Sequence, residues 1–167
     1  MSDLADGMDD AALRALAARV GEQLLAAGHT LVTAESCTGG WIAKALTDVA
    51  GSSRWFEGGF VTYSNAAKIR DLGVSIGALR TDGAVSELVA REMAAGALRL
   101  SSADFALAVT GIAGPDGGST LKPVGTVWFA IARRDGELTE VEARVQHFAG
   151  DREAVRRKSV QFALDLL

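Results

Sequence analysis

The sequence predicts an α/β fold, a three-layer α/β/α sandwich built on a mixed central sheet. One observation is that segments with helical spacing of apolar residues alternate with short apolar runs, which is typical of this class. A second is that the runs at 104–109 and 126–132 are continuously apolar, as expected of strands that are covered on both faces. A third is that residues 139–147 alternate between apolar and polar, which predicts a half-exposed antiparallel strand near an edge.

Length and composition favour one domain over residues 11–167, preceded by a flexible tail at 1–10. The chain has 167 residues, of which 49% are hydrophobic and 23% charged, a profile typical of a globular protein. A net charge of −4 gives no global basic surface for nucleic acid or an anionic membrane. The chain has one cysteine, no apolar signal segment and no run of about 18 apolar residues, so we expect a cytoplasmic protein.

Periodicity and capping residues place the individual elements. Apolar residues recur at helical spacing from 11 to 27, where Gly28 marks the end, and Asn65, Ser86 and Asp151 are candidate N-caps of later helices. In chain order we expect helix 11–27, strand 30–35, a helix from 39 or 40 to about 48, strand 56–64, helix 65–72, loop 73–83, helix 86–100, strand 104–109, loop 110–125, strand 126–132, strand 139–147 and a helix from 151 to the C-terminus.

Three loops are candidates for a binding site because each follows a predicted strand. They are residues 35–40, 63–68 and 110–125, and all are rich in Gly, Ser, Thr or Asn. In α/β sheets, ligands bind beyond the carboxyl ends of the strands. The loop at 110–125 is longer than a simple connector requires, so it is either a backbone cradle for an anionic or planar ligand or a mobile surface loop.

Several well-known site types are absent from the sequence. Residues 111–118, "GIAGPDGG", do not fit the phosphate-binding loop pattern, and "ESCTG" does not fit the nucleophile elbow of serine hydrolases. With only two histidines, His29 and His147, and one cysteine, the chain offers no zinc site, and we expect no metal and no cofactor.

The stretch "LVTAESCTGGWIAK" at 31–44 contains three potential nucleophiles, Ser36, Cys37 and Thr38. Cys37 is intrinsically the strongest, but it has no histidine nearby in sequence and buried cysteines are usually inert. A serine nucleophile needs another proton acceptor, and a lysine that burial keeps neutral can serve. Lys68 is the candidate, with Tyr63 nearby in "YSNAAK", although spacing alone favours a solvated helix lysine.

Backbone groups supply further candidates. The N–H groups of residues 38–40 at a helix start could hold an anion or an oxyanion, or could form an ordinary capped turn. Gly39 and Gly40 permit close approach of a ligand. The basic segment 152–158 at the start of the last helix is expected to be a solvated face.

Five blocks of the sequence stand out together: "TAESCTGGWIAKALTDVAGSS", "FVTYSNAAK", "GAVSE", "TGIAGPDGGS…KPVGTVW" and "GDREAVR". They resemble the CinA C-terminal domain family, the bacterial nicotinamide-nucleotide amidohydrolases. They stand in the family's order, and the similarity runs from about residue 11 to the end. The resemblance implies the stand-alone form of the family, without the additional N-terminal domain of its larger members.

The resemblance also implies an activity and a set of site residues. The activity is hydrolysis of the carboxamide of nicotinamide mononucleotide, which gives nicotinic acid mononucleotide and ammonia and salvages a pyridine nucleotide. The family's serine, lysine and tyrosine fall on Ser36, Lys68 and Tyr63. The residues expected to bind this small-molecule nucleotide are Thr38, Gly39, Gly40, Ser64, Asn65, Thr110, Gly111, Ala113 and Gly114.

Two other functions stay open at this point. One is a non-catalytic nucleotide-binding module with a regulatory or competence-related role, which would use the same glycine-rich loops without turnover. The other is an amidase with a different small amide as substrate. Family analogy also implies a homo-oligomer, with the apolar face of helix 86–100 as a possible interface.

Overall fold

The structure is a computed structural model that describes residues 7–167. The first six residues of the predicted tail lie outside the described range. Helix α1 (Asp10–Ala27) begins directly after Asp9, whose carboxylate accepts the N–H of Ala12 at 2.8 Å. The side chain of Met8 packs against the hydrophobic core.

The described residues form one mixed sheet of five strands in the order β2-β1-β3-β4-β5. The strands are β1 (Leu31–Glu35), β2 (Phe56–Val61), β3 (Phe105–Gly111), β4 (Thr126–Asp135) and β5 (Leu138–His147). Strand β1 runs parallel to both β2 and β3, whereas β4 is antiparallel to both β3 and β5. The predicted antiparallel edge strand is therefore confirmed as β5.

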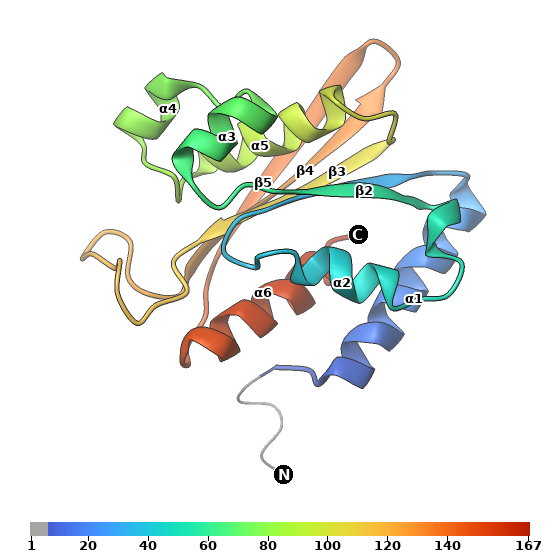
Figure 1. Cartoon of the computed structure of the whole chain (residues 1–167), viewed down its shortest axis with the longest axis horizontal. Helices are drawn as coiled ribbons and strands as arrows, with labels where there is room; N and C mark the ends of the chain where they lie inside the picture. Colours follow the sequence, from blue (N-terminus) through green and yellow to red (C-terminus); the bar gives the residue numbers. More distant parts are fainter. Residues whose placement is uncertain (1–6) are drawn as a thin grey trace.

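Helices cover both faces of the sheet, which confirms the predicted α/β/α sandwich (Figure 1). On one face lie α1, α2 (Trp41–Thr47) and α6 (Arg152–Asp165); on the other lie α3 (Asn65–Leu72), α4 (Ile76–Thr81) and α5 (Glu87–Arg99). A short 3₁₀ helix, η1 (Ser52–Arg54), precedes β2. Each face has its own hydrophobic core, because the central strands bury apolar side chains in both directions. Among residues 7–167, no helix has the length and apolar character needed to cross a membrane.

The predicted caps are mostly confirmed. Gly28 ends α1 in the left-handed conformation, and Ser86 and Asp151 cap α5 and α6 by accepting a backbone N–H three residues later. The prediction for α3 was wrong by one residue. Ser64 is the cap and accepts the N–H of Ala67 at 3.1 Å, while Asn65 is the first helical residue.

Four other boundaries also differ from prediction. The segment 73–83, expected as a loop, contains α4, which Ser75 caps. The loop expected at 110–125 starts later, since Thr110 and Gly111 pair with β4 as the last residues of β3. Strand β2 ends at Val61 rather than 64, and β4 continues to Asp135. In each case hydrogen bonding to a neighbouring element decides the boundary, and local composition does not reveal that neighbour.

The apolar face of α5 is not a free surface for association, contrary to the expectation for helix 86–100. Val89 and Met93 are fully buried against the sheet within the same chain. Gly96 lies where α5 approaches the end of α3, and a Cβ added there would be 2.1 Å from the carbonyl oxygen of Leu72. No side chain fits at this crossing, so the glycine permits the contact.

We expect Gly96→Ala to lower the free energy of unfolding by about 2 kcal/mol or more, because backbone atoms must move to admit the methyl group. Urea denaturation of the purified variant measures this change. The matched control is Gly77→Ala in α4, where an added Cβ meets nothing within 4 Å. That control should be neutral or slightly stabilising, since alanine is the better helix former. Equal stability of Gly96→Ala and the unaltered protein would contradict the steric argument.

Candidate active site

One edge of the sheet gathers all three candidate loops. The parallel strands β2, β1 and β3 end there, and they lead into the loops at 62–64, 36–40 and 112–125. Strand β5 runs in the same direction as β3, so α6 also begins at this edge, beside the loop 112–125 (Figure 1). The expectation that these loops meet beyond the strand ends is confirmed.

Ser36 and Lys68 are in direct contact at this edge. The Nζ of Lys68 lies 2.8 Å from the Oγ of Ser36 and donates a second hydrogen bond to the carbonyl oxygen of Thr62 at 2.6 Å. Lys68 is only 1% exposed and Ser36 7% exposed. Ser36 follows β1 directly, while Lys68 lies one turn into α3, after β2. Because β1 and β2 are adjacent parallel strands, their ends bring the two side chains together.

Burial changes the proton affinity of Lys68. Desolvation of the ammonium lowers the pKa of Lys68 from 10.5 to about 8. No carboxylate of residues 7–167 pairs with this ammonium to restore the ordinary value. With such a pKa, about a tenth of the lysine is neutral at pH 7 and able to accept a proton.

Cys37 lies beside Ser36 but is not a reactive nucleophile. Burial raises the pKa of the Cys37 thiol to about 12, so the thiolate that a cysteine nucleophile needs is absent near neutral pH. The neutral thiol also does not stabilise the ammonium of Lys68. Of the potential nucleophiles at 36–38, Ser36 is therefore the one with a base in contact. The hydroxyl of Thr38 is engaged, since it donates to a carboxylate oxygen of Glu35 at 2.6 Å.

A cavity of about 280 Å³ opens onto Ser36 and Lys68; we call it the serine cavity. It brings together most of the predicted site residues. Its walls include Ser36, Cys37, Tyr63, Lys68, Ala84, Val85, Thr110, Gly111, Ile112, Ala113, Gly114, Asp116, Gly117 and Arg152. Neither histidine of the chain is among them, in keeping with a base other than histidine.

Five predicted substrate-binding residues lie outside the serine cavity. Thr38, Gly39 and Gly40 line a second cavity beside it, and the N–H of Gly39 already donates to the carbonyl oxygen of Ser36 at 3.0 Å. Ser64 caps α3, and Asn65 is an exposed residue of its first turn. Within the described residues, neither Ser64 nor Asn65 lines either cavity.

Arg152 is a site residue that the sequence did not reveal. Its guanidinium donates to the carbonyl oxygen of Gly114 at 2.7 Å and to the phenolic oxygen of Tyr63 at 2.9 Å. Arg156, one turn later, donates to the carbonyl oxygens of Cys37 at 3.0 Å and Thr38 at 3.2 Å. The interpretation of 152–158 as a solvated face was wrong for Arg156, which is half-buried, whereas Arg152 is exposed as expected but also makes two hydrogen bonds. Their spacing of four, which places them on one helix face, was the available signal.

The turn that carries Ser36 is held by a buried carboxylate. Glu35 is fully buried, and besides the Thr38 hydroxyl it accepts the N–H of Ile42 at 2.9 Å and of Ala43 at 3.0 Å. These are N–H groups at the start of α2, where Gly40 has no side chain with which to cap the helix. Glu35 therefore takes the place of a cap and fixes the direction in which the chain leaves β1.

We expect Glu35→Gln to lower the free energy of unfolding by about 1 to 3 kcal/mol. The glutamine amide has one acceptor oxygen, and its NH₂ group cannot accept either backbone N–H. Urea denaturation measures the loss. The control is Glu57→Gln on the surface, where the carboxylate accepts from the N–H and hydroxyl of Ser102. Equal changes for the two variants would contradict a special role for the buried carboxylate.

Comparison with known proteins gives relatives that match nearly the whole chain. The CinA C-terminal domain family matches residues 13–167. The chain is 56% identical over 161 residues to the nicotinamide-nucleotide amidohydrolase PncC of Escherichia coli (strain K12), and the match covers 96% of this chain and 95% of that protein. It is 55% identical over 150 residues to the nicotinamide-nucleotide amidohydrolase PncC of Pseudomonas putida, with 90% and 91% covered.

Solved structures share the whole fold. The competence/damage inducible protein CihA of Agrobacterium tumefaciens superposes with a TM-score of 0.89 at 46% identity and covers 96% of this chain and 94% of its own. The competence damage-inducible protein A of Klebsiella pneumoniae gives a TM-score of 0.87 at 44% identity, with 92% and 93% covered. Family match, identity and fold agree over nearly the full length, so the chain belongs to the CinA C-terminal domain family.

Proposed function

We propose that this protein hydrolyses the carboxamide of nicotinamide mononucleotide to nicotinic acid mononucleotide and ammonia, with Ser36 as nucleophile and Lys68 as general base. The observation that carries the proposal is the 2.8 Å contact between Lys68 Nζ and Ser36 Oγ at the wall of a cavity. The names of relatives that are 55–56% identical over most of the chain support the choice of substrate.

The first half of the reaction transfers the acyl group to the enzyme. Neutral Lys68 takes the proton of the Ser36 hydroxyl as Oγ attacks the amide carbon, which gives a tetrahedral intermediate and a protonated lysine. The lysine then returns this proton to the amide nitrogen, and the carbon–nitrogen bond breaks. Ammonia leaves, and the acyl group stays on Ser36 as an ester.

The second half uses water in the same way. Lys68, neutral again, takes a proton from a water molecule that attacks the ester carbon. When the second tetrahedral intermediate collapses, Lys68 gives the proton back to Ser36 Oγ, and the carboxylic acid product leaves. One lysine thus serves as base and acid in both halves, and its lowered pKa suits this exchange near neutral pH.

Two groups next to Ser36 and Lys68 have assigned roles in this mechanism. The N–H of Thr38 is our candidate donor to the oxyanion. Thr38 lines the neighbouring cavity but is only two residues from Ser36, and the N–H of Gly39 already donates to the carbonyl oxygen of Ser36. Tyr63 is 62% exposed and its hydroxyl is held by Arg152, so it stands at the mouth of the serine cavity. We assign it to orienting the substrate and to assisting proton return to the leaving ammonia.

Ammonia release from nicotinamide mononucleotide is the direct test, with free nicotinamide as a parallel substrate. We expect release from the nucleotide and little from the free amide, because the phosphate adds binding energy. Thermal stabilisation by the nucleotide without ammonia would instead favour the non-catalytic binding module. Equal turnover of the free amide would favour an amidase with another substrate. A homo-oligomeric state and a cytoplasmic location stay predictions, and light scattering in solution checks the first.

A further inference from the structure

A second cavity, of about 640 Å³, lies next to the serine cavity; we call it the arginine cavity. It is lined by Asp10, Thr38, Gly39, Gly40, Trp41, Lys44, Arg152, Glu153, Arg156 and Arg157. Arg152 lines both cavities and is the residue at their junction. A ligand with its reactive group at Ser36 can therefore extend past Arg152 into the arginine cavity.

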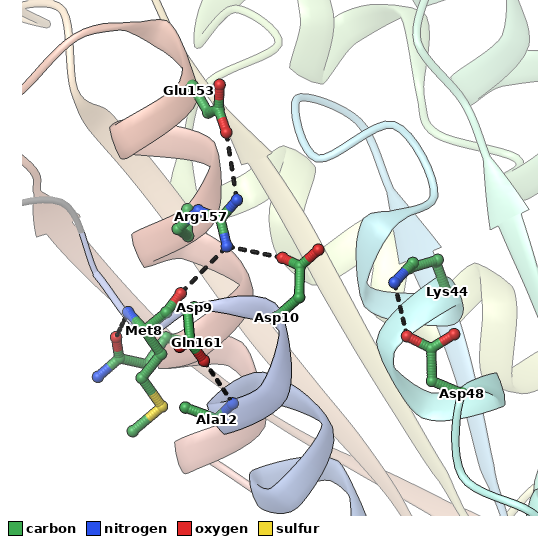
Figure 2. A network of polar contacts seen from close by, with 9 residues as sticks. All are labelled: Met8, Asp9, Asp10, Ala12, Lys44, Asp48, Glu153, Arg157 and Gln161. Carbon is green, nitrogen blue, oxygen red and sulfur yellow. Dashed lines mark hydrogen bonds and ion pairs between the residues drawn. The ribbon is translucent and has the colours of Figure 1, made fainter. Parts of the chain in front are cut away.

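The charges of the arginine cavity are unbalanced. Four cationic side chains and two carboxylates line it. The two carboxylates are both used by Arg157, which lies between Asp10 at 2.7 Å and Glu153 at 3.2 Å (Figure 2). Lys44 pairs with Asp48 at 2.6 Å, but this ion pair is exposed and such pairs are weak, so Lys44 remains available to an anion in the cavity that it lines.

The two remaining guanidinium groups carry the excess charge. Within residues 7–167, Arg152 and Arg156 donate only to carbonyl oxygens and to the Tyr63 hydroxyl, and neither pairs with a carboxylate. Hydrogen bonds to neutral oxygens orient a guanidinium without neutralising it. The pair therefore presents two fixed positive charges to the cavity, which suits a phosphate.

Glycine keeps the space in front of these charges open. Gly39 and Gly40 line the arginine cavity with φ of 60° and 96°, the left-handed region that other residues rarely adopt. A Cβ on Gly39 would be 3.5 Å from the Nη2 of Arg156. The absence of a side chain at Gly39 leaves the Arg156 guanidinium accessible to a ligand.

The serine cavity contains a carboxylate beside its two basic side chains, Lys68 and Arg152. Asp116 lines it, and a phosphate placed there would meet this carboxylate. The cationic pyridinium ring of nicotinamide mononucleotide, by contrast, is attracted to it. A carboxylate in the wall of the serine cavity and the cations of the arginine cavity suit a ligand whose reactive ring is cationic and whose far end is anionic.

We propose that the arginine cavity binds the phosphate of the substrate, with Arg152, Arg156 and Lys44 as its cations, while the pyridinium ring occupies the serine cavity. This inference rests on the proposed function, because it assigns the two ends of that substrate to the two cavities. The proposal also separates phosphate binding from oxyanion binding among residues 38–40. Gly39 and Gly40 belong to the wall of the phosphate subsite, and the oxyanion is left to a donor nearer Ser36.

Equilibrium binding to the Ser36→Ala protein, which prevents turnover, tests the subsite. The ligands are nicotinamide mononucleotide and nicotinamide riboside, which share the cationic ring and differ by the phosphate. The readout is the ratio of their dissociation constants, measured by calorimetry in Ser36→Ala alone and with Lys44→Ala or Arg152→Ala added. We expect the phosphate preference to fall about tenfold with either addition, as for the loss of one charge-assisted contact.

The ratio of the two dissociation constants distinguishes loss of phosphate binding from indirect effects of each substitution. Arg152→Ala also frees Tyr63, but that disturbance weakens both ligands and cancels in the ratio. The matched control is Asp48→Ala, which removes the partner of Lys44 and should leave the preference unchanged or raise it. An unaltered preference in both Lys44→Ala and Arg152→Ala would overturn the assignment. Because the ratio needs no catalysis, this failure differs from failure of the proposed function, which is absence of ammonia release by the unaltered enzyme.

Discussion

Ser36→Ala is expected to lower ammonia release from nicotinamide mononucleotide by about 10³-fold or more. The reason is that Ser36 is the potential nucleophile in contact with a base, through the 2.8 Å contact to Lys68 Nζ. Without its Oγ no acyl-enzyme can form, and the remaining groups can only bind and polarise the amide. The measurement is kcat for ammonia release in a coupled assay. The fold should be retained, because alanine removes one oxygen and adds nothing.

The neighbouring cysteine provides the control for this prediction. Cys37→Ala leaves the Ser36–Lys68 contact in place, and the thiol it removes has a pKa raised to about 12 by burial. We expect this variant to keep most of the activity. The reverse pattern, an inactive Cys37→Ala and an active Ser36→Ala, would show that the nucleophile has been assigned to the wrong residue.

Lys68→Met is expected to have the second largest effect, a loss of about 10²- to 10⁴-fold in kcat, the usual contribution of a general base. Methionine keeps an unbranched apolar stem in the buried site but cannot accept a proton. The free energy of unfolding should not fall, since Lys68 is 1% exposed and its ammonium has no carboxylate partner in the described chain. Inactivity together with unchanged or increased stability would separate a catalytic role from a structural one.

The same lysine fixes the direction of the pH dependence. Burial lowers the pKa of Lys68 to about 8, and the neutral amine is the form that accepts the serine proton. As pH rises from 6 towards 8 the neutral fraction grows, so kcat/KM should rise about tenfold per pH unit and level off above pH 8. An activity that is flat between pH 6 and 9, or that falls through this range, would contradict Lys68 as the base.

The sequence predicted most of the fold because its signals are local. Helical periodicity placed α1, continuous apolar runs placed β3 and β4, and Ser86 and Asp151 marked helix starts. The errors arose where a distant partner decides the structure. Thr110 and Gly111 extend β3 because β4 pairs with them, although their composition is that of a loop. The composition of residues 73–83 likewise did not reveal helix α4.

The site was only partly accessible to sequence reasoning. Spacing could not separate a solvated Lys68 from a buried one, and the family resemblance selected Ser36, Lys68 and Tyr63. Arg152 was missed because it lies 89 residues from Tyr63, the residue whose hydroxyl it holds. Asp116 was missed as well, since a carboxylate in a glycine-rich loop gives no signal until the loop is folded against Ser36.

By itself the sequence determined most of the elements, α4 excepted, and which chemical groups are available, because periodicity, caps and side-chain types are properties of neighbouring residues. Only the tertiary structure decided that an amine 32 residues from a serine is buried against it. The pKa of that amine depends on how completely the folded chain excludes water from it, and the charges of the two cavities depend on which ends of strands and helices meet. The desolvation of a side chain and the sum of charges from distant segments depend on the folded structure, so no short stretch of sequence reveals them.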